Sequence, residues 1–212
     1  MTLTEDRLAQ SRAAVAEDVP AGGRYAQARR AMITSQLRTS GVNEGWVLEA
    51  IARVPREDYV PADVRDAAYI DRAVPLGNGK FLAAPLFQGK VLSEAVPTVQ
   101  DKALLVGDGA GYLAALLRPL VGTLDAVMPG DTASGAAGGY SLLVIDGAIE
   151  ELPESLADQL QDGGRIVTGL VERGVTRLAA GTKAAGTVSL LPLAEMGIPV
   201  LPEFAAPKRW SF

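Results

Sequence analysis

A short glycine-rich segment, Gly107-Asp108-Gly109-Ala110-Gly111, has the composition of a ligand-binding turn. It follows the apolar run 103–106 and precedes a helical pattern that starts at Tyr112. Between a buried strand and a helix the backbone turns tightly, and a ligand can approach it closely because glycine has no Cβ. The spacing is GxGxG rather than the GxGxxG of dinucleotide-binding proteins, so it favours a fold that binds S-adenosylmethionine (AdoMet) over one that binds NAD. The alternative is that the three glycines only permit a strand-to-helix turn.

The residue types that are absent from the chain limit its chemistry. Its 212 residues include no Cys and no His, which excludes thiolate nucleophiles, Ser-His-Asp triads and most transition-metal sites, so we expect no metal. Any reaction must depend on carboxylates, hydroxyls, backbone groups or a bound cofactor. The formal net charge of −5 provides no basic face for phosphates, so we expect no nucleic-acid partner.

Several charged residues have both a functional and a structural interpretation. Asp146, followed by Gly147, stands after an apolar strand pattern, where it could hold a substrate amide or a cation, or simply form a turn. Arg56 and the adjacent Glu57 are expected to form a solvated pair. Three further acidic residues are expected to interact with the positive end of the next helix rather than to act as catalytic acids, namely Glu150, Glu151 and Glu154.

The apolar segments around these residues predict the fold. Short apolar runs at 103–106, 123–127, 142–145 and 165–168 predict strands, and helical patterns at 112–117 and 153–161 lie between them. This alternation predicts an α/β protein with right-handed βαβ crossovers and a mostly parallel, doubly wound sheet with helices on both faces. Segments 176–179 and 187–191, with glycines between them, predict an antiparallel hairpin.

The N-terminal part of the chain predicts a helical layer. From Tyr25, apolar residues recur at helical spacing as far as a stop at Ser40-Gly41, and a second helix is expected to be capped by Asn43 and to end at Pro55. Each helix has one apolar stripe, so we expect both to pack on the sheet within a single domain, residues 25–212, preceded by an extension, residues 1–24. Glycines and prolines at 74–79 predict turns, and 86–96 predicts another helix.

The ends of the chain bear on localisation and partners. Residues 1–25 lack the continuous apolar core of a signal peptide, and no run reaches the ~18 apolar residues that span a bilayer, so we expect a cytoplasmic protein without a membrane partner. Trp210 and Phe212 are expected to dock on the body of the protein or on a second subunit, which leaves a homodimer possible.

Longer strings of residues give a specific resemblance. In order along about residues 25–170, the chain is similar to the protein-L-isoaspartate O-methyltransferases. The strings that carry the similarity are Arg30-x-Met32, Gln36-Leu37, Gly41-Val42, Val47-Leu48-x-Ala50-Ile51-x-x-Val54-Pro55-Arg56-Glu57-x-Tyr59-Val60-Pro61, Ala68-Tyr69-x-Asp71, Val74-Pro75-Leu76-Gly77-Asn78-Gly79, Ala84-Pro85, Gly107-x-Gly109-x-Gly111-Tyr112 and Leu152-Pro153-x-x-Leu156-x-x-Gln159-Leu160-x-x-Gly163-Gly164-Arg165.

This resemblance implies a Rossmann-like class I methyltransferase fold and AdoMet-dependent methylation of isoaspartyl carboxylates in damaged proteins or peptides. The substrate carboxylate is itself the nucleophile, so such an enzyme mainly aligns it with the methyl group and needs no strong base. The positions that the resemblance assigns to cofactor binding are Gly107, Asp108, Gly109, Gly111 and Met128. The positions that it assigns to the substrate are Leu82, Ala83 and Pro85.

The chain departs from the family pattern at several of these positions. Ala83 stands where the family has a Ser hydroxyl near the methyl-transfer site, Leu105 stands where a Glu is usual, and Val127-Met128 stands where an acidic residue would accept the ribose hydroxyls. The interval from Gly111 to Leu142 is also too short for a complete set of βαβ units of ~30 residues each, so one strand–helix unit is expected to be missing and replaced by a flexible linker at 129–139.

Three interpretations remain open from the sequence. The first is a working isoaspartyl methyltransferase with an altered pocket. Within this family we expect methyl transfer to be weakened or lost, with AdoMet as cofactor if the protein is active and none otherwise. The second is a non-enzymatic scaffold or binding protein that descends from the family and has a protein partner. The third is an unrelated nucleotide-binding α/β enzyme.

Overall fold

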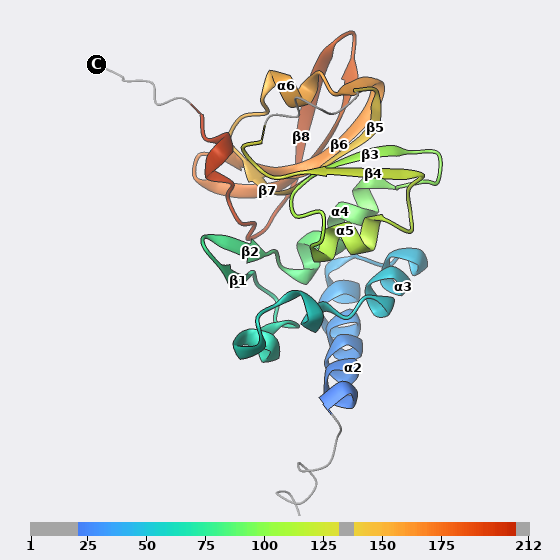
Figure 1. Ribbon diagram of the computed structural model, residues 1–212, viewed down its shortest axis with the longest axis vertical. Coiled ribbons are helices and arrows are strands. Elements are labelled where there is room, and N and C mark those ends of the chain that lie inside the picture. Colours follow the sequence, from blue (N-terminus) through green and yellow to red (C-terminus); the bar gives the residue numbers. More distant parts are fainter. Residues whose placement is uncertain (1–20, 132–137, 207–212) are drawn as a thin grey trace, which may run out of the picture.

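The central element of the protein is a six-stranded sheet with the order β4-β3-β5-β6-β7-β8 (Figure 1). The computed structural model describes residues 21–131 and 138–206. Neighbouring strands are parallel from β4 through β6, and the two last pairs are antiparallel. The strands are β3 (Lys102–Val106), β4 (Thr123–Val127), β5 (Tyr140–Ile149), β6 (Leu160–Glu172), β7 (Val175–Ala184) and β8 (Thr187–Glu195). The predicted α/β class and mostly parallel sheet are confirmed.

Strand β3 lies in the middle of the parallel part because its residues are apolar on both faces. Leu104, Leu105 and Val106 are all fully buried, as expected for a strand that has a neighbour on each side and a packed layer above and below. In the described ranges β4 pairs only with β3, so it forms one edge of the sheet.

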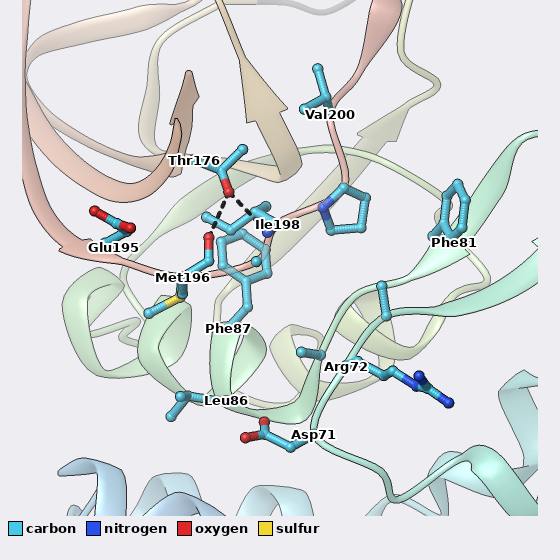
Figure 2. Close-up of a pocket in the computed structure, with 14 residues that line it drawn as sticks. Asp71, Arg72, Phe81, Leu86, Phe87, Thr176, Glu195, Met196, Ile198 and Val200 are labelled. Atoms are coloured by element: carbon cyan, nitrogen blue, oxygen red, sulfur yellow. Dashed lines mark hydrogen bonds between the residues drawn. The ribbon is translucent and has the colours of Figure 1, made fainter. Parts of the chain in front are cut away.

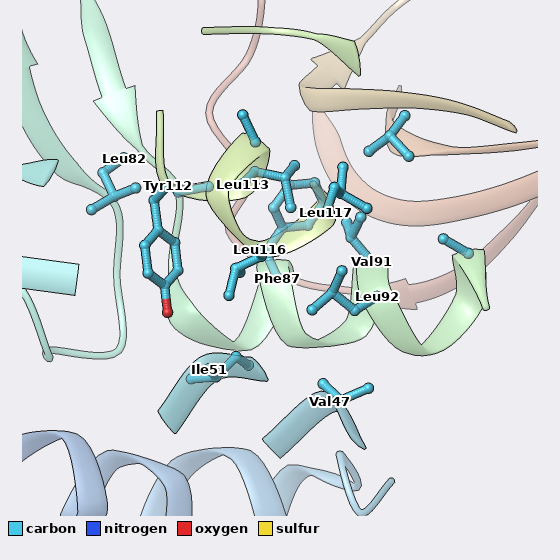
Figure 3. Close-up of a cluster of buried hydrophobic side chains, with 14 of the residues drawn as sticks. Val47, Ile51, Leu82, Phe87, Val91, Leu92, Tyr112, Leu113, Leu116 and Leu117 are labelled. Carbon is cyan, nitrogen blue, oxygen red and sulfur yellow. The ribbon is translucent and has the colours of Figure 1, made fainter. Parts of the chain in front are cut away.

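The helices cover mainly one face of this sheet. Helices α4 (Pro85–Ala95) and α5 (Tyr112–Leu117) lie directly against it, and α2 (Ala21–Met32) and α3 (Gly45–Arg53) lie beyond them (Figure 1). Figure 3 shows the core that joins these layers: Val47 and Ile51 of α3 face Phe87, Val91 and Leu92 of α4, which pack against Leu113, Leu116 and Leu117 of α5.

The opposite face of the sheet is covered differently. A second core contains Leu104, Val106 and Ile145, which pack with Leu156 and Phe204. The helix on this side is α6 (Glu154–Ala157), a single turn that is shorter than the predicted helix at 153–161 because β6 already begins at Leu160. Helices were predicted on both faces of the sheet, and on this second face the predicted helix is α6, which is only one turn long.

The return from β4 to β5 is short, as predicted. It occupies residues 128–139, of which 132–137 lie outside the described residues. A strand–helix unit needs ~30 residues. Among the described residues no strand lies beyond β4, so the predicted absence of one unit agrees with the sheet.

The N-terminal helices share the main core with the sheet. Helix α2 begins at Ala21, four residues before the predicted start, and continues through a π-helical turn (Ile33–Leu37) and a 3₁₀ turn (Arg38–Ser40). Gly41 then ends it at φ 80°, as the Ser40-Gly41 signal predicted. The predicted cap of α3 by Asn43 is wrong: Glu44 occupies the cap position and makes no side-chain cap hydrogen bond.

The remaining short elements lie outside the six-stranded sheet. The turn signals at 74–79 correspond to an antiparallel hairpin of β1 (Val74–Gly77) and β2 (Lys80–Leu82). Short 3₁₀ helices cover Arg56–Tyr59, Ala62–Ala67 and Pro202–Phe204. None of the helices in the described ranges has the length and apolar character that a membrane crossing requires.

The C-terminal half of the sheet is a meander of three long strands. Two-residue turns join them, Arg173-Gly174 between β6 and β7 and Ala185-Gly186 between β7 and β8, and all four turn residues have positive φ. This is the turn geometry that suits the twist of antiparallel hairpins. The predicted hairpin is confirmed, and its strands are longer than the 176–179 and 187–191 segments.

Candidate functional site

A cleft of about 610 Å³ lies at the carboxyl ends of the parallel strands. Three strands contribute to it: β3 through Gly107 and Asp108, β4 through Met128 and Pro129, and β5 through Asp146. Hairpin β1–β2 and residues 199–203 of the C-terminal segment form its other walls. Open α/β sheets bind their ligands at this edge, so the cleft is the candidate site.

The glycine-rich turn is shaped by contacts within the protein itself. Gly107 donates its N–H to Val127 O at 2.8 Å, which ties the turn to the end of β4. A Cβ at Gly109 would lie 2.9 Å from the Cβ of Ala126. Asp108 Oδ1 accepts a hydrogen bond from the N–H of Ala110 at 2.9 Å, which fixes the turn. The strand-to-helix interpretation of these glycines therefore has a packing basis, whether or not a ligand is bound.

The structure brings most of the predicted cofactor positions together. Gly107, Asp108, Gly111 and Met128 line the cleft, whereas Gly109 lies behind its wall against β4. At the end of β4 the family pattern has an acidic residue that accepts hydrogen bonds from the ribose hydroxyls. Here the thioether of Met128 is at most a weak acceptor.

Asp125 does not compensate for the missing acceptor. Its Oδ2 accepts a hydrogen bond from the Tyr140 hydroxyl at 2.7 Å, and it does not line the cleft. Asp108 is the acidic residue of the glycine turn that does line it.

The predicted substrate positions are less accessible. Leu82 lines the cleft, but Ala83 is only 1% exposed and Pro85 is buried as the first residue of α4. Neither Ala83 nor Pro85 contributes to the cleft lining. The backbone of Ala83 has a structural partner, because its carbonyl accepts a hydrogen bond from Arg56.

Arg56 lies buried beneath the cleft, so the predicted solvated pair with Glu57 is wrong. Its guanidinium donates to Ala68 O at 2.6 Å and also to Ala83 O and Gln88 Oε1. It also lies over the ring of Tyr112, 5.1 Å from the centroid. Burial lowers the pKa of Arg56 to about 10, so the side chain stays charged at neutral pH.

Glu57 points into a separate, partly buried network. Its carboxylate accepts hydrogen bonds from Arg29 Nη2 at 2.9 Å and from the Tyr69 hydroxyl. Burial opposes ionisation, but these two donors together keep the pKa of Glu57 below its usual value. This network joins α2 to the 3₁₀ turns and lies outside the cleft lining.

Asp146 is a half-buried carboxylate in the lining of the cleft. It lies inside β5 rather than in a turn after it, so the predicted turn at Asp146-Gly147 is wrong. Burial raises the pKa of Asp146 to about 6; Arg56 and the Gln88 amide oppose this rise, and the charge of Asp108 adds to it. Its Oδ1 is buried and has no hydrogen-bond partner within the part of the chain that the structure describes, although the Gln88 amide is close enough to lower the pKa.

The strand continues past Asp146 because it pairs with β6 at Ala148 and Ile149 and also with the C-terminal segment. Ala148 donates its N–H to Pro199 O and accepts from the N–H of Leu201, both at 2.8 Å. A Cβ at Gly147 would lie 2.6 Å from Leu201, so this residue must be small. Residues 199–203 are thereby held across the cleft, a contribution that no strand signal in the sequence indicated.

A second cavity, of about 740 Å³, adjoins the cleft and shares Phe81, Pro199 and Val200 with it. Figure 2 shows Phe87, Met196 and Ile198 lining it, with Thr176 Oγ1 bonded to the backbone of residues 196 and 198. It is the larger cavity, but it lies away from the glycine turn and contains no buried carboxylate. The converging polar groups are in the cleft.

Other predicted residues lie at the periphery. Glu150 accepts a hydrogen bond from the N–H of Ala206 at 2.8 Å, and Glu154 is in the first turn of α6. Trp210 and Phe212 lie outside the described residues. In the described ranges, no three carboxylates are grouped so that they could hold a metal ion. Gln88, which lies beneath the cleft, and Tyr112, which lines it, were not predicted as site residues, because a helix pattern alone does not show which polar residue is buried.

Comparison with known proteins identifies the family of the chain. Residues 27–133 match the model of the family described as "Protein-L-isoaspartate(D-aspartate) O-methyltransferase (PCMT)". The chain belongs to the protein-L-isoaspartate O-methyltransferase family. Among relatives of that name, one from Koribacter versatilis is 32% identical over 68% of this chain and 76% of its own length, and one from Methanoculleus marisnigri is 29% identical over 78% and 87%.

Solved methyltransferase structures of this family share the fold. A putative protein-L-isoaspartate O-methyltransferase from Plasmodium falciparum, in complex with S-adenosyl-L-homocysteine, superposes with a TM-score of 0.67 at 18% identity and covers 82% of this chain and 98% of its own. A second structure, titled protein-L-isoaspartate O-methyltransferase, gives a TM-score of 0.66 at 17% identity, over 81% and 65%. The resemblance drawn from the residue strings is confirmed.

Proposed function

We propose that this protein is a member of the protein-L-isoaspartate O-methyltransferase family that keeps the AdoMet cleft but binds AdoMet weakly, and in which methyl transfer to isoaspartyl carboxylates is weakened or lost. The observation that carries the proposal is the composition of the cleft wall after β4. Met128 and Pro129 form this wall, and neither side chain can accept the two ribose hydroxyls of the cofactor.

The cleft fits the cofactor in place and size but not in all of its polar contacts. Its position at the carboxyl ends of β3 and β4 and its volume suit a nucleoside-sized ligand, and Gly107 and Asp108 would border it. When bound, AdoMet supplies an electrophilic methyl group. Each ribose hydroxyl that is left without an acceptor in a closed site costs roughly 1–3 kcal/mol.

The substrate side supports the same conclusion. A carboxylate nucleophile needs alignment rather than a base, so a lost hydrogen-bond donor acts directly on the rate. Ala83 supplies no hydroxyl, and its side chain faces the core. Charged Arg56 cannot take over this task, because its guanidinium is already bonded to Ala68, Gln88 and Ala83 beneath the cleft.

Calorimetry with AdoMet and S-adenosyl-L-homocysteine tests the cofactor half of the proposal. We expect a dissociation constant in the millimolar range and about tenfold tighter binding for Met128→Glu, since one restored acceptor is worth roughly 1.4 kcal/mol. Met196→Glu is the matched control: it adds the same charge at another half-buried methionine, in the neighbouring cavity. Micromolar binding by the unaltered protein would contradict the proposal.

Transfer of radiolabelled methyl from AdoMet to an isoaspartyl peptide tests the other half. We expect the rate to be close to that of the uncatalysed control, and a rate typical of an efficient enzyme would overturn the proposal. If neither the unaltered protein nor Met128→Glu binds the cofactor at millimolar concentration, the non-enzymatic scaffold interpretation is favoured instead.

A further inference from the structure

Asp146 occupies the point of the sheet where ligands are expected to bind. Its Cβ lies next to Gly107, where a Cβ would be only 3.1 Å away, so β5 passes the end of β3 at Asp146. From here the chain leaves β3 towards β4 on one side, and β5 leads to β6 on the other. Such a switch in strand order opens a crevice, and Asp146 lines the cleft at this crevice.

The support beneath Asp146 has a fixed polarity. Gln88 is fully buried, and its Oε1 accepts a hydrogen bond from Arg56. Because a guanidinium has donors only, the amide oxygen must face Arg56 and the amide NH₂ must face away from it. That NH₂ has no hydrogen-bond partner and lies near Asp146, whose ionised form it favours. Arg56 therefore fixes the orientation of the Gln88 amide, and this orientation directs the amide NH₂ towards Asp146.

The charged residues around Asp146 determine which ligand charge the cleft favours. Asp58, Asp108 and Glu203 also line the cleft, against one cation, Lys80. A carboxylate ligand at this end would meet like charges in a partly closed site, whereas a cation would give the half-buried carboxylate of Asp146 in the cleft lining a partner of opposite charge. An ionised carboxylate accepts hydrogen bonds only, so its preferred ligand group also donates them.

We propose that Asp146 binds a positively charged, hydrogen-bond-donating group of the ligand, such as an ammonium, and that this cleft therefore prefers cationic ligands to carboxylates. The inference rests on the proposed function only in using the same cleft. The ammonium has two possible sources, the amino-acid part of an AdoMet-type cofactor or an amine of a separate ligand.

The first experiment compares three small probes of similar size but different charge by NMR titration of the unaltered protein: n-butylammonium, butyramide and butyrate. We expect n-butylammonium to shift the amide resonances of Gly107 and Gly111 most strongly and butyrate least. Equal shifts from all three, or a preference for butyrate, would overturn the inference. No cofactor and no methyl transfer are involved, so this result is independent of the proposed function.

The second experiment removes the charge with Asp146→Asn, and Asp158→Asn, an exposed residue after α6, is the control. We expect Asp146→Asn to abolish the preference for n-butylammonium and the control to preserve it. An unchanged preference for n-butylammonium in Asp146→Asn would overturn the inference. If this variant does not fold, the titration of the unaltered protein with the three probes is the deciding test.

Two nucleosides then distinguish the sources of the ammonium. S-adenosyl-L-homocysteine carries an amino group, and 5′-methylthioadenosine does not. About tenfold weaker binding of the first but not of the second by Asp146→Asn assigns the ammonium to the cofactor. If binding of both is unchanged while the n-butylammonium preference is lost, the ammonium belongs to a separate ligand. If binding of both is unchanged and that preference is kept, the inference fails.

Discussion

Asp146 lines the cleft, Arg56 is buried beneath it, and Gln88 lies between these two charged side chains. The deeper one is well bonded, whereas the carboxylate next to the cleft is left with a buried, unpartnered oxygen. Burying an incompletely paired charge lowers stability, and functional sites commonly contain such groups. The two residues should therefore respond to substitution in opposite directions.

Asp146→Asn is expected to stabilise the protein at neutral pH. The pKa of Asp146 is raised from its usual value to about 6, so its contribution to stability is full at pH 4 and below and is lost as the pH rises through 6. The neutral amide avoids this loss, and we expect a gain of about 1–3 kcal/mol in the free energy of unfolding at pH 7.

Urea denaturation of the unaltered protein and of Asp146→Asn between pH 4 and 8 measures the difference in their free energies of unfolding. This difference should shrink towards pH 4. Asp63→Asn, at an exposed position, is the control and should change stability little at any pH. A destabilising effect of Asp146→Asn at pH 7 would show that Asp146 has a stabilising partner.

Arg56→Lys is expected to destabilise the protein by about 2–4 kcal/mol. An ammonium cannot reach the three acceptors that the planar guanidinium bonds at once, so at least one buried carbonyl or amide oxygen loses its donor. Arg53→Lys is the matched control, because Arg53 is exposed and pairs with Glu49 on the helix surface, where a charge pair contributes less than about 1 kcal/mol. Equal shifts in the melting temperature of the two variants would contradict the buried role of Arg56.

At the scale of elements, the sequence predicted the segments with local signals and missed those that depend on distant partners. Strands β3 and β4 and helix α5 agree closely with their apolar patterns. Strand β5 was predicted to end at Ile145 because Asp146-Gly147 resembles a turn, but its partner at residues 199–201 is far away in sequence. Arg56 was misassigned for the same reason, since two of its three acceptors lie more than 20 residues away, at positions 83 and 88.

The candidate site was predicted to a similar extent. The glycine turn could be found because a strand-to-helix turn follows from hydrophobic patterns, whereas Met128 was assigned to the site by the family resemblance. The orientation of Ala83 towards the core and the roles of Gln88 and residues 199–203 depend on tertiary packing, which one sequence does not encode in any local pattern.

The N-terminal helices provide a test of the single-domain prediction. Val47, Leu48 and Ile51 of α3 are buried in the same core as α4 and α5, so removal of α2 and α3 would expose that face. We expect a chain beginning at residue 55 to lose cooperative unfolding in circular dichroism, and a chain beginning at residue 21 to retain it. Cooperative melting of the shorter chain at the original temperature would show that the helices form a separate unit.

At the scale of the whole molecule, the C-terminal segment connects the fold to the site. Residues 199–203 wall the cleft, and Phe204, only 7% exposed, anchors them in the smaller core. One short stretch of chain therefore affects both the stability of that face and the shape of the site.

Phe204→Ala is expected to lower the free energy of unfolding by about 3 kcal/mol, as for other buried aromatic truncations, and also to weaken ligand binding in the cleft. Phe81→Ala is the control: Phe81 also lines the cleft but is 50% exposed, so its loss should change stability by less than about 1 kcal/mol. Chemical denaturation of the two variants distinguishes them, and equal losses of stability would show that Phe204 is not an anchor.

The two-residue turns that join β6, β7 and β8 also set the order in which the molecule assembles. Pairing across such turns closes very short loops, whereas pairing of β3 with β5 requires the chain to return from β4 first. Closing short loops costs less entropy and is faster, so the meander should form early in refolding and the parallel register late. In pulsed hydrogen-exchange labelling, the amides of Val167 and Ala180 should gain protection before that of Leu105; simultaneous protection would mean that the sheet closes in one step.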